Sequence, residues 1–284
     1  MSRIVYVNGD YVPEEDAKIS VFDRGFLMAD AVYEVTSVLD GKLADWPGHC
    51  VRLARSLSEL KMAAPCSDDE LLEIHRELVK RNDLVEGLVY LQVTRGAADR
   101  DFAWPKHAEP GIVLFTQDKP LAETKQAEQG ISVMPMEDLR WGRRDIKTTM
   151  LLYPSFAKMA AKEQGADDAW MIDQHGFVTE GTSNNAYIIK NGEIITRQLS
   201  NDILHGITRA TVLELAEEAQ MKVIERPFTI DEAQSADEAF ITAASTFVCP
   251  VVKVAGKTLG DGTPGPMAKR LREIYIANAR AKSI

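Results

Sequence analysis

The chain has 284 residues, 45% hydrophobic and 27% charged, which is the composition of a globular protein with room for one large domain or two ordinary ones. Its 33 basic and 43 acidic residues give a formal net charge of −10, which argues against generic binding to nucleic acid or to anionic membranes. We find no signal peptide and no apolar run that approaches a membrane span, and therefore expect a cytoplasmic protein.

The first half of the chain predicts a small α+β domain. The expected elements are a hairpin, two helices and two strands, at residues 4–12, 45–62, 67–81, 88–95 and 112–116. Asp45 is the predicted N-cap of the first helix, and Ser67 with Glu70 forms a capping box for the second. A polar segment containing Pro120 follows, which is typical of a linker. We therefore expect an N-terminal domain over residues 1–120.

The second half mixes strands and helices without the strict alternation of a doubly wound fold. The expected strands lie at residues 131–136, 168–172, 177–179, 186–190, 193–196, 240–242 and 251–254. The expected helices lie at residues 154–164, 208–220 and 266–281, with a further capping box at residues 229–232. Thr208 is the predicted N-cap of its helix. We expect a larger C-terminal α+β domain over residues 121–284.

Two familiar kinds of site are not favoured by the sequence. Gly260 to Gly265 match the dinucleotide-binding pattern G-x-G-x-x-G, but they follow a predicted hairpin and contain Pro264, so we interpret them as a surface loop. The three cysteines show no pairing motif and the five histidines lack ligand spacing. We therefore predict reduced cysteines and no metal site.

Lys147 is the most informative residue, because it stands between the charged residues Arg143 to Asp145 and an apolar run. Lysine is the side chain that can hold an aldehyde cofactor covalently and also transfer protons. Nearby arginines favour its neutral, nucleophilic form. The alternative interpretation is an ordinary solvated lysine.

Three further features supply groups that a pyridoxal 5′-phosphate site needs. Residues 206–208 open a predicted helix, where free N–H groups and a hydroxyl bind an anion. Arg52, on the first helix beside His49, can grip a phosphate. Glu180 precedes a run of small hydroxyl and amide residues and can keep a ring nitrogen protonated. Taken singly, these features are also explained as an N-cap, a solvated helix face and an exposed acid in a turn.

Segments along nearly the whole chain resemble the class IV (fold-type IV) pyridoxal-phosphate-dependent aminotransferases, and among them the D-amino acid aminotransferases. These segments are Asp23-Arg24-Gly25, Asp30 to Glu34, His49 to Leu53, Gln92 to Gly96, Arg140-Trp141, Asp145-Ile146-Lys147, Thr179-Glu180-Gly181 and Gly206 to Arg209. The resemblance implies an α+β fold of two domains with the cofactor at the domain interface. It also implies a homodimer in which the partner subunit completes each site.

The resemblance assigns roles to individual residues. Lys147, in the expected C-terminal domain, matches the catalytic lysine that holds the cofactor as a Schiff base, and Glu180 matches the acid paired with the pyridine nitrogen. The other implied cofactor residues form a phosphate cradle and pack on the ring: Arg52, Ile207, Thr208, Ala244 and Leu204. The implied substrate-binding residues are Tyr33, Arg100, Thr182 and Ser183.

Two positions depart from the family pattern. D-amino acid aminotransferases carry Arg-x-His in a loop that binds the substrate carboxylate, whereas here Arg100-Asp101-Phe102 has Phe102 in place of the histidine. Ala243-Ala244 stands where the family tends to carry Ser and Thr. The first departure weakens the carboxylate trap, and the second removes a hydroxyl from the phosphate cradle and leaves the backbone N–H of Ala244.

The implied reaction is transfer of an amino group from a D-amino acid such as D-alanine to a 2-oxo acid such as 2-oxoglutarate, in two half-reactions. An (R)-selective amine transaminase and a branched-chain L-amino acid aminotransferase are the nearest alternatives. An aminodeoxychorismate lyase-type enzyme on the same scaffold is a third, and a non-catalytic protein that binds the cofactor is a fourth.

Overall fold

The computed structural model describes residues 2–284 and separates the chain into two compact units. The first unit runs to Pro120 and also includes Ile146–Met150 and Ala279–Ile284, while the second comprises Leu121–Asp145 and Leu151–Asn278. The first change of unit coincides with the predicted linker. No helix within the described residues is long and apolar enough to cross a membrane.

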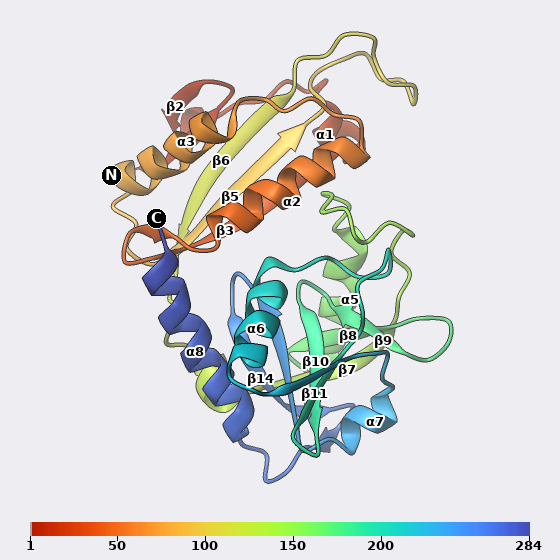
Figure 1. Cartoon of the computed structure of the whole chain (residues 1–284). Helices are drawn as coiled ribbons and strands as arrows, with labels where there is room; N and C mark the ends of the chain where they lie inside the picture. The colour runs from red at the N-terminus through yellow and green to blue at the C-terminus, as the bar shows by residue number, and fades with distance from the viewer. Residues whose placement is uncertain (1) are drawn as a thin grey trace. The chain divides into compact units, whose positions relative to one another are not determined.

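The first unit is built on an antiparallel sheet of six strands in the order β2-β1-β6-β5-β3-β4. The strands are β1 (Ile4–Val7), β2 (Asp10–Pro13), β3 (Ala31–Leu39), β4 (Lys42–Leu43), β5 (Gly87–Thr94) and β6 (Gly111–Asp118). The helices are the 3-10 turn η1 (Glu14–Asp16), α1 (Arg24–Met28), α2 (Trp46–Glu59) and α3 (Asp68–Arg81). Figure 1 shows α2 and α3 along one face of this sheet, and the loop between β5 and β6 extending away from it.

The helix starts of this unit test the cap predictions. The capping box of Ser67 and Glu70 is present at α3, because side chain and backbone bond reciprocally there. Asp45 occupies the N-cap position of α2, as predicted, but its backbone lies in the left-handed region at φ 53° and its side chain makes no capping hydrogen bond. At α1, the carboxylate of Asp23 accepts hydrogen bonds from the N–H groups of Gly25 and Phe26.

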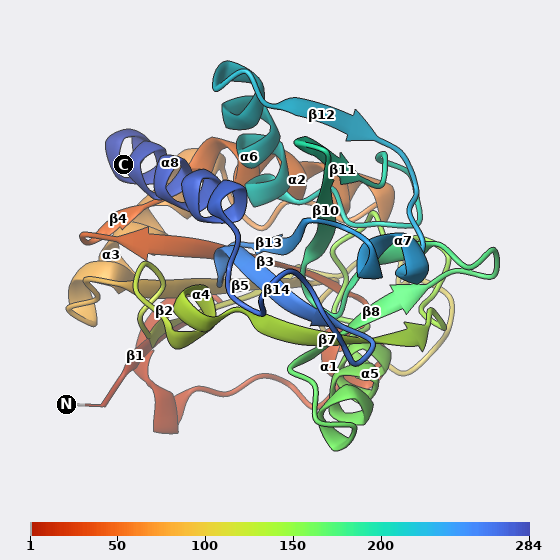
Figure 2. The same cartoon turned by 90° about the horizontal axis from the view of Figure 1, so that it is seen from below.

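The second unit is built on a mixed sheet of nine strands, which follow the order β12-β11-β10-β13-β14-β7-β8-β9 with β15 paired to β14. The strands are β7 (Ile131–Glu137), β8 (Asp168–Ile172), β9 (Val178–Gly181), β10 (Asn185–Lys190), β11 (Glu193–Thr196), β12 (Lys222–Glu225), β13 (Glu238–Ala243), β14 (Phe247–Val254) and β15 (Lys257–Thr258). The helices are α4 (Lys125–Gln129), α5 (Leu152–Glu163), α6 (Ile207–Glu218), α7 (Ile230–Gln234) and α8 (Pro266–Lys282), of which the end from Ala279 onward belongs to the first unit. Helix α5 packs against β7 and β8, and α6 against β12 and β13 (Figure 2).

The short segment Ile146–Met150 adds to the edge of β3 in the first unit. The N–H of Tyr33 donates to the carbonyl of Lys147 at 3.0 Å, and the N–H of Thr149 donates to the carbonyl of Ala31 at 3.2 Å. Lys147 therefore belongs to the first unit, and its expected place in the C-terminal domain is corrected. These backbone hydrogen bonds join residues more than a hundred positions apart, which no local sequence pattern reveals.

Candidate active site

Lys147 is held against an aromatic ring of the first unit. Its Nζ lies 4.0 Å from the centre of the Tyr33 ring, a cation–π arrangement. Tyr33 stacks on Tyr90 with ring centres 5.6 Å apart, and Tyr90 stacks on Phe115 at 4.7 Å. The three rings come from β3, β5 and β6, so a row of aromatic side chains across the sheet fixes the ring that positions the lysine.

The two arginines that precede Lys147 are paired with carboxylates. Arg143 donates to both oxygens of Asp145, at 2.9 and 3.0 Å. Arg144 lies 3.4 Å from a carboxylate oxygen of Asp138 and also bonds to Asp202. Both arginines are thus held by carboxylates, Asp145 for Arg143 and Asp138 with Asp202 for Arg144.

Arg52 is buried on α2 and bound to a carboxylate on β3. Its Nε and Nη2 donate to the two oxygens of Glu34 at 2.8 and 2.7 Å, and His49 Nδ1 lies 2.7 Å from the same carboxylate. Burial alone would raise the pKa of Glu34, but Arg52 and His49 outweigh it and lower the pKa to about 2. The interpretation of Arg52 as part of a solvated helix face is therefore wrong, since a buried ionised acid orients its guanidinium.

Glu180 lies buried in β9 of the second unit, and its carboxylate accepts hydrogen bonds from three groups. Arg140 Nη1 donates to one oxygen at 2.6 Å and Asn185 Nδ2 donates to the other at 2.9 Å. The N–H of Leu204 bonds to both oxygens, at 3.2 and 3.1 Å. Burial raises the pKa of the Glu180 carboxyl, while Arg140 acts in the opposite direction. Glu180 is thus a buried acid held by three donors, and its interpretation as an exposed acid in a turn is wrong.

The start of α6 lies next to this acid. Leu204 bonds to Glu180, and the carbonyl of Leu204 accepts a hydrogen bond from Asn185 Nδ2 at 3.0 Å. The helix begins at Ile207 with Gly206 as N-cap and no side-chain capping bond, so the prediction of Thr208 as the cap is wrong. Thr208 is instead a buried residue of the first turn. The backbone N–H groups of the first turn therefore have no capping side chain.

The turn between β13 and β14 contains Ala244. The N–H of Thr246 donates to the carbonyl of Ala243 at 3.2 Å, and Arg272 Nη1 donates to the carbonyl of Thr246 at 2.7 Å. The hydroxyl of Thr246 is buried and has no hydrogen-bond partner within residues 2–284. Sequence reasoning missed this hydroxyl, since it considered only the two alanines as replacements for hydroxyl residues.

The proposed substrate residues differ in their surroundings. The Thr182 hydroxyl is bound to Asp168 at 2.5 Å, so it fixes its own loop, whereas Ser183 is exposed. Arg100 lies in the exposed loop between β5 and β6, with its guanidinium 5.5 Å from the Phe102 ring centre. Phe102 is 83% exposed. Arg100 and Phe102 thus lie together. Arg100, Phe102, Thr182 and Ser183 share no hydrogen bond with Lys147 or Glu180 among those found in residues 2–284, whereas the backbone N–H of Tyr33 bonds to the Lys147 carbonyl.

Comparison with known proteins identifies the family. Residues 31–254 match the family described as amino-transferase class IV. The chain belongs to the class IV aminotransferases. It is 39% identical over 284 residues to the D-alanine aminotransferase of Staphylococcus epidermidis, covering 99% of both chains, and 38% identical over 268 residues to that of Bacillus licheniformis, covering 94% of both.

Solved structures agree with this family assignment. A branched-chain amino acid aminotransferase of T.th., solved with pyridoxamine 5′-phosphate, is 26% identical with a TM-score of 0.91 over 99% of this chain and 95% of that chain. The Escherichia coli branched-chain enzyme, at 23% identity and a TM-score of 0.91 over 98% of this chain and 95% of that chain, shares the fold. The chain is thus a pyridoxal-phosphate-dependent aminotransferase with the fold-type IV architecture, as the sequence predicts.

The residues of this class IV aminotransferase fit the cofactor chemically. A carboxylate offers about four acceptor sites, and the three donors on Glu180 leave capacity for a protonated ring nitrogen. The uncapped start of α6 and the unpaired Thr246 hydroxyl offer donors for a phosphate. Four partners of these groups were not assigned from sequence: Glu34, Asp138, Arg140 and Asn185.

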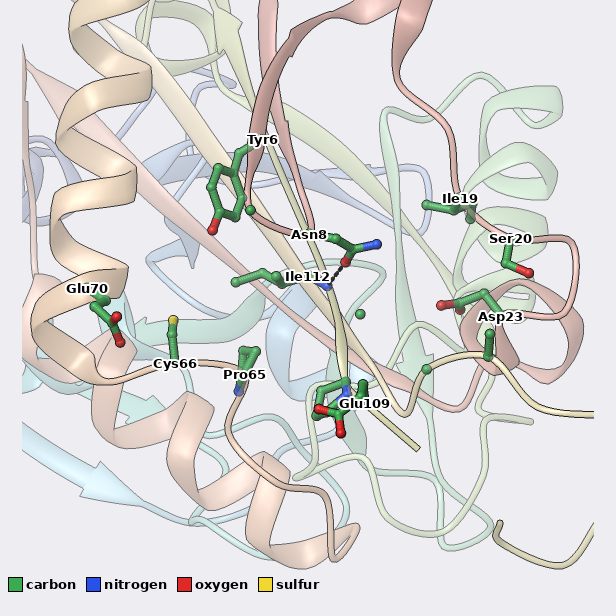
Figure 3. A pocket seen from close by; sticks show the side chains of 15 residues that line it. Tyr6, Asn8, Ile19, Ser20, Asp23, Pro65, Cys66, Glu70, Glu109 and Ile112 are labelled. Carbon is green, nitrogen blue, oxygen red and sulfur yellow. Dashed lines mark hydrogen bonds between the residues drawn. The ribbon is translucent and has the colours of Figure 1, made fainter. Parts of the chain in front are cut away.

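An open pocket of about 550 Å³ in the first unit is separate from these residues (Figure 3). Its lining includes Asp23, Glu70 and Glu109 and contains no lysine or arginine. The Asp23 and Glu70 carboxylates already cap helices. None of the proposed cofactor or substrate residues lines it.

Proposed function

We propose that this aminotransferase transfers the amino group of a D-amino acid, with D-alanine as the model donor, to a 2-oxo acid such as 2-oxoglutarate. The observation that carries the proposal is 39% identity to a D-alanine aminotransferase over 99% of both chains. A homodimer and a cytoplasmic location, both expected from the sequence, are part of the proposal. Light scattering on the purified holoenzyme tests the dimer.

The bound pyridoxal 5′-phosphate supplies a carbonyl that exchanges for the donor's amino group and a protonated ring that withdraws electrons from the reacting carbon. Lys147 would hold the cofactor through its Nζ and, once released from it, would use that amine to take up and return the proton that the donor's Cα loses. Tyr33 supports this step by keeping Nζ over its ring, 4.0 Å from the ring centre.

Glu180 maintains the positive charge of the ring nitrogen in the proposed site. An ionised carboxylate beside a pyridinium raises the pyridinium pKa, so the ring keeps its proton and its electron demand. Arg52 binds the phosphate while Glu34 fixes its guanidinium, and the N–H groups of Ile207 and Thr208 complete the cradle. Leu204 and Ala244 complete the set of cofactor contacts.

The residues proposed to bind the substrate differ from the family pattern at Phe102, which stands in place of a histidine. Arg100 is the cation that binds the substrate carboxylate, together with Tyr33 and the loop of Thr182 and Ser183. Phe102 offers no hydrogen bond to that carboxylate, which favours the (R)-selective amine transaminase as the second candidate. The branched-chain enzymes that share the fold make L-leucine the third substrate to test.

The test follows the visible absorbance of the bound cofactor during single-substrate additions. D-Alanine should convert the spectrum to that of the amino form, and L-leucine should leave it unchanged. Conversion by (R)-1-phenylethylamine with no response to D-alanine would refute the proposed donor. Addition of aminodeoxychorismate tests the lyase alternative: elimination of pyruvate from it, with its amino group kept on the remaining product, would identify a lyase instead.

A second measurement tests the lysine directly. Lys147→Ala should abolish the visible band of the covalently held cofactor, whereas Lys162→Ala, at an exposed position of α5, should keep it. An unchanged band in Lys147→Ala would overturn the site assignment. Sodium borohydride reduction followed by peptide mass analysis gives an independent readout, since the reduced cofactor stays on the residue that held it.

A further inference from the structure

A buried arginine joins two carboxylates beside the proposed ring-nitrogen site. Arg140 Nε and Nη2 donate to the two oxygens of Asp138 at 2.9 and 2.8 Å, and its Nη1 donates to Glu180 at 2.6 Å. The side chains of Asp138, Arg140 and Glu180 are 0%, 12% and 4% exposed. In the sequence, Arg140 is only one of the residues that resemble the family, and the resemblance assigns it no role.

Asp138 is itself fixed by the sheet of the second unit. It directly follows β7, and its N–H donates to the carbonyl of Ile172 in β8 at 2.9 Å. The hydroxyl of Thr179 in β9 donates to its carboxylate at 2.7 Å. Arg140 is therefore held by a residue tied to three strands, and its third guanidinium nitrogen, Nη1, donates to Glu180.

The ionisation of Glu180 depends on this contact. Burial favours the protonated form of a carboxyl group and raises the pKa of Glu180, and the negative charge of Asp138 adds a smaller effect in the same direction. Arg140 is the main opposing influence, and its own pKa is raised because Glu180 and Asp138 outweigh the effect of burial. Asn185 and Leu204 add neutral donors, which orient the carboxylate and carry no full charge.

We propose that Arg140 is a positioning residue of the reaction: it fixes the orientation of Glu180 and keeps it ionised, so that this acid holds the protonated ring nitrogen. Asp138 fixes the guanidinium in turn. The inference rests on the proposed role of Glu180 and deepens it. A geometry of three directed N–H groups makes lysine an inadequate replacement, because an ammonium lacks the planar fork.

The test compares Arg140→Met and Arg140→Lys with the matched control Arg197→Met in reconstituted holoenzyme. Arg197 is 10% exposed and binds two carboxylates, Asp173 and Asp202, but does not contact Glu180. The readouts are the cofactor dissociation constant, the pH midpoint of the visible spectrum, and kcat and KM separately. Thermal unfolding of each variant reports its folding.

In Arg140→Met we expect the cofactor dissociation constant to rise about 10- to 100-fold, which is the range for losing one hydrogen bond to a charged group. The spectral midpoint should move by about one pH unit or more, and kcat should fall far more than KM for the amino donor rises. Arg140→Lys should recover part of the midpoint shift. Arg197→Met should lower the unfolding temperature without moving the midpoint.

The Glu180→Gln background separates the two proposals. If Arg140 acts through Glu180, Arg140→Met should add little to the midpoint shift that Glu180→Gln already causes. The proposed role of Arg140 is overturned if the midpoint shifts of Arg140→Met and Glu180→Gln add up in the double variant. It is also overturned if Arg140→Met has the same midpoint as Arg197→Met. Neither result affects the proposed role of Glu180. An unchanged spectrum in Glu180→Gln overturns the assignment of Glu180 and the inference with it.

Discussion

Replacement of His75 by Phe should make the class IV aminotransferase less sensitive to mild acid. His75 is fully buried on α3, its ring packs edge-on against Trp46 at 4.5 Å, and its Nδ1 lies 2.7 Å from the carbonyl of Leu71. The Nε2 atom has no partner within residues 2–284. Burial, with a smaller contribution from His49, lowers the pKa of His75 to about 4 against the opposing effects of the Leu71 carbonyl and Glu34. The folded protein therefore holds a neutral imidazole.

The sign of the effect follows from proton linkage. Between the unfolded pKa of 6.5 and the folded pKa of about 4, the unfolded chain binds more protons at this site, so stability falls as pH falls. Between pH 7 and pH 5 this single group should remove about 2 kcal/mol of unfolding free energy. His75→Phe keeps a ring against Trp46 and removes the titrating group. The variant should therefore lose about 2 kcal/mol less unfolding free energy between pH 7 and pH 5 than the wild type does.

Urea unfolding at pH 7 and pH 5, followed by tryptophan fluorescence, measures this difference. His107→Gln is the control, because His107 is exposed on the loop between β5 and β6 and should leave the pH dependence of the wild type unchanged. If His75→Phe loses as much stability as the wild type between the two pH values, the assignment of a neutral buried imidazole is refuted.

Three further substitutions test other parts of the site. Glu34→Gln breaks a buried ion pair and should cost about 3 kcal/mol of stability while weakening cofactor binding through Arg52, as measured by urea unfolding and equilibrium dialysis. Gly206→Ala places a methyl group 2.1 Å from Asn185 Oδ1 and should weaken cofactor binding by about 1–3 kcal/mol, as measured by fluorescence titration. Unchanged affinity would show that the Asn185 side chain can move away from the methyl group without affecting the cofactor. Phe102→His adds a donor and should raise kcat/KM for D-alanine about tenfold or more without improving (R)-1-phenylethylamine; equal gains for both would contradict carboxylate binding.

The parts of the fold that depend on local chemistry were predictable. The hairpin at residues 4–12 and the capping box at Ser67 are confirmed, because turn residues and caps act within a few positions of each other. The cap predicted at Thr208 is wrong, because Gly206 occupies that position. Asp45 occupies the N-cap position predicted for it but makes no side-chain capping hydrogen bond. Both residue types suit a cap, but the backbone conformation decides which residue occupies the position and whether its side chain can bond there.

The longest strand of the first unit, β3, was not predicted, and the reason is electrostatic. Its sequence places Glu34 among buried apolar positions, which reads as a break in a core strand. The partners that make this burial tolerable, His49 and Arg52, lie 15 and 18 residues further on. The pair of Arg140 and Glu180 spans 40 residues in the same way. Lys147 and Glu180 could be proposed from residue types and resemblance, whereas the partners that tune such groups depend on long-range folding.

The edge pairing of Ile146–Met150 with β3 also bears on how the chain folds during synthesis. The first unit needs three separate stretches of sequence, and the last, Ala279–Ile284, pairs with Leu43 through reciprocal backbone hydrogen bonds at 2.9 and 3.1 Å. A ribosome that has made only residues 1–120 has produced a sheet without its lysine-bearing edge segment and without this terminal pairing. The second unit has nearly all of its sequence before the first can be completed. Lys147 therefore reaches its β3 pairing partner only after residue 147 has been made, and the unit that carries it is finished only once residues 279–284 can pair with it.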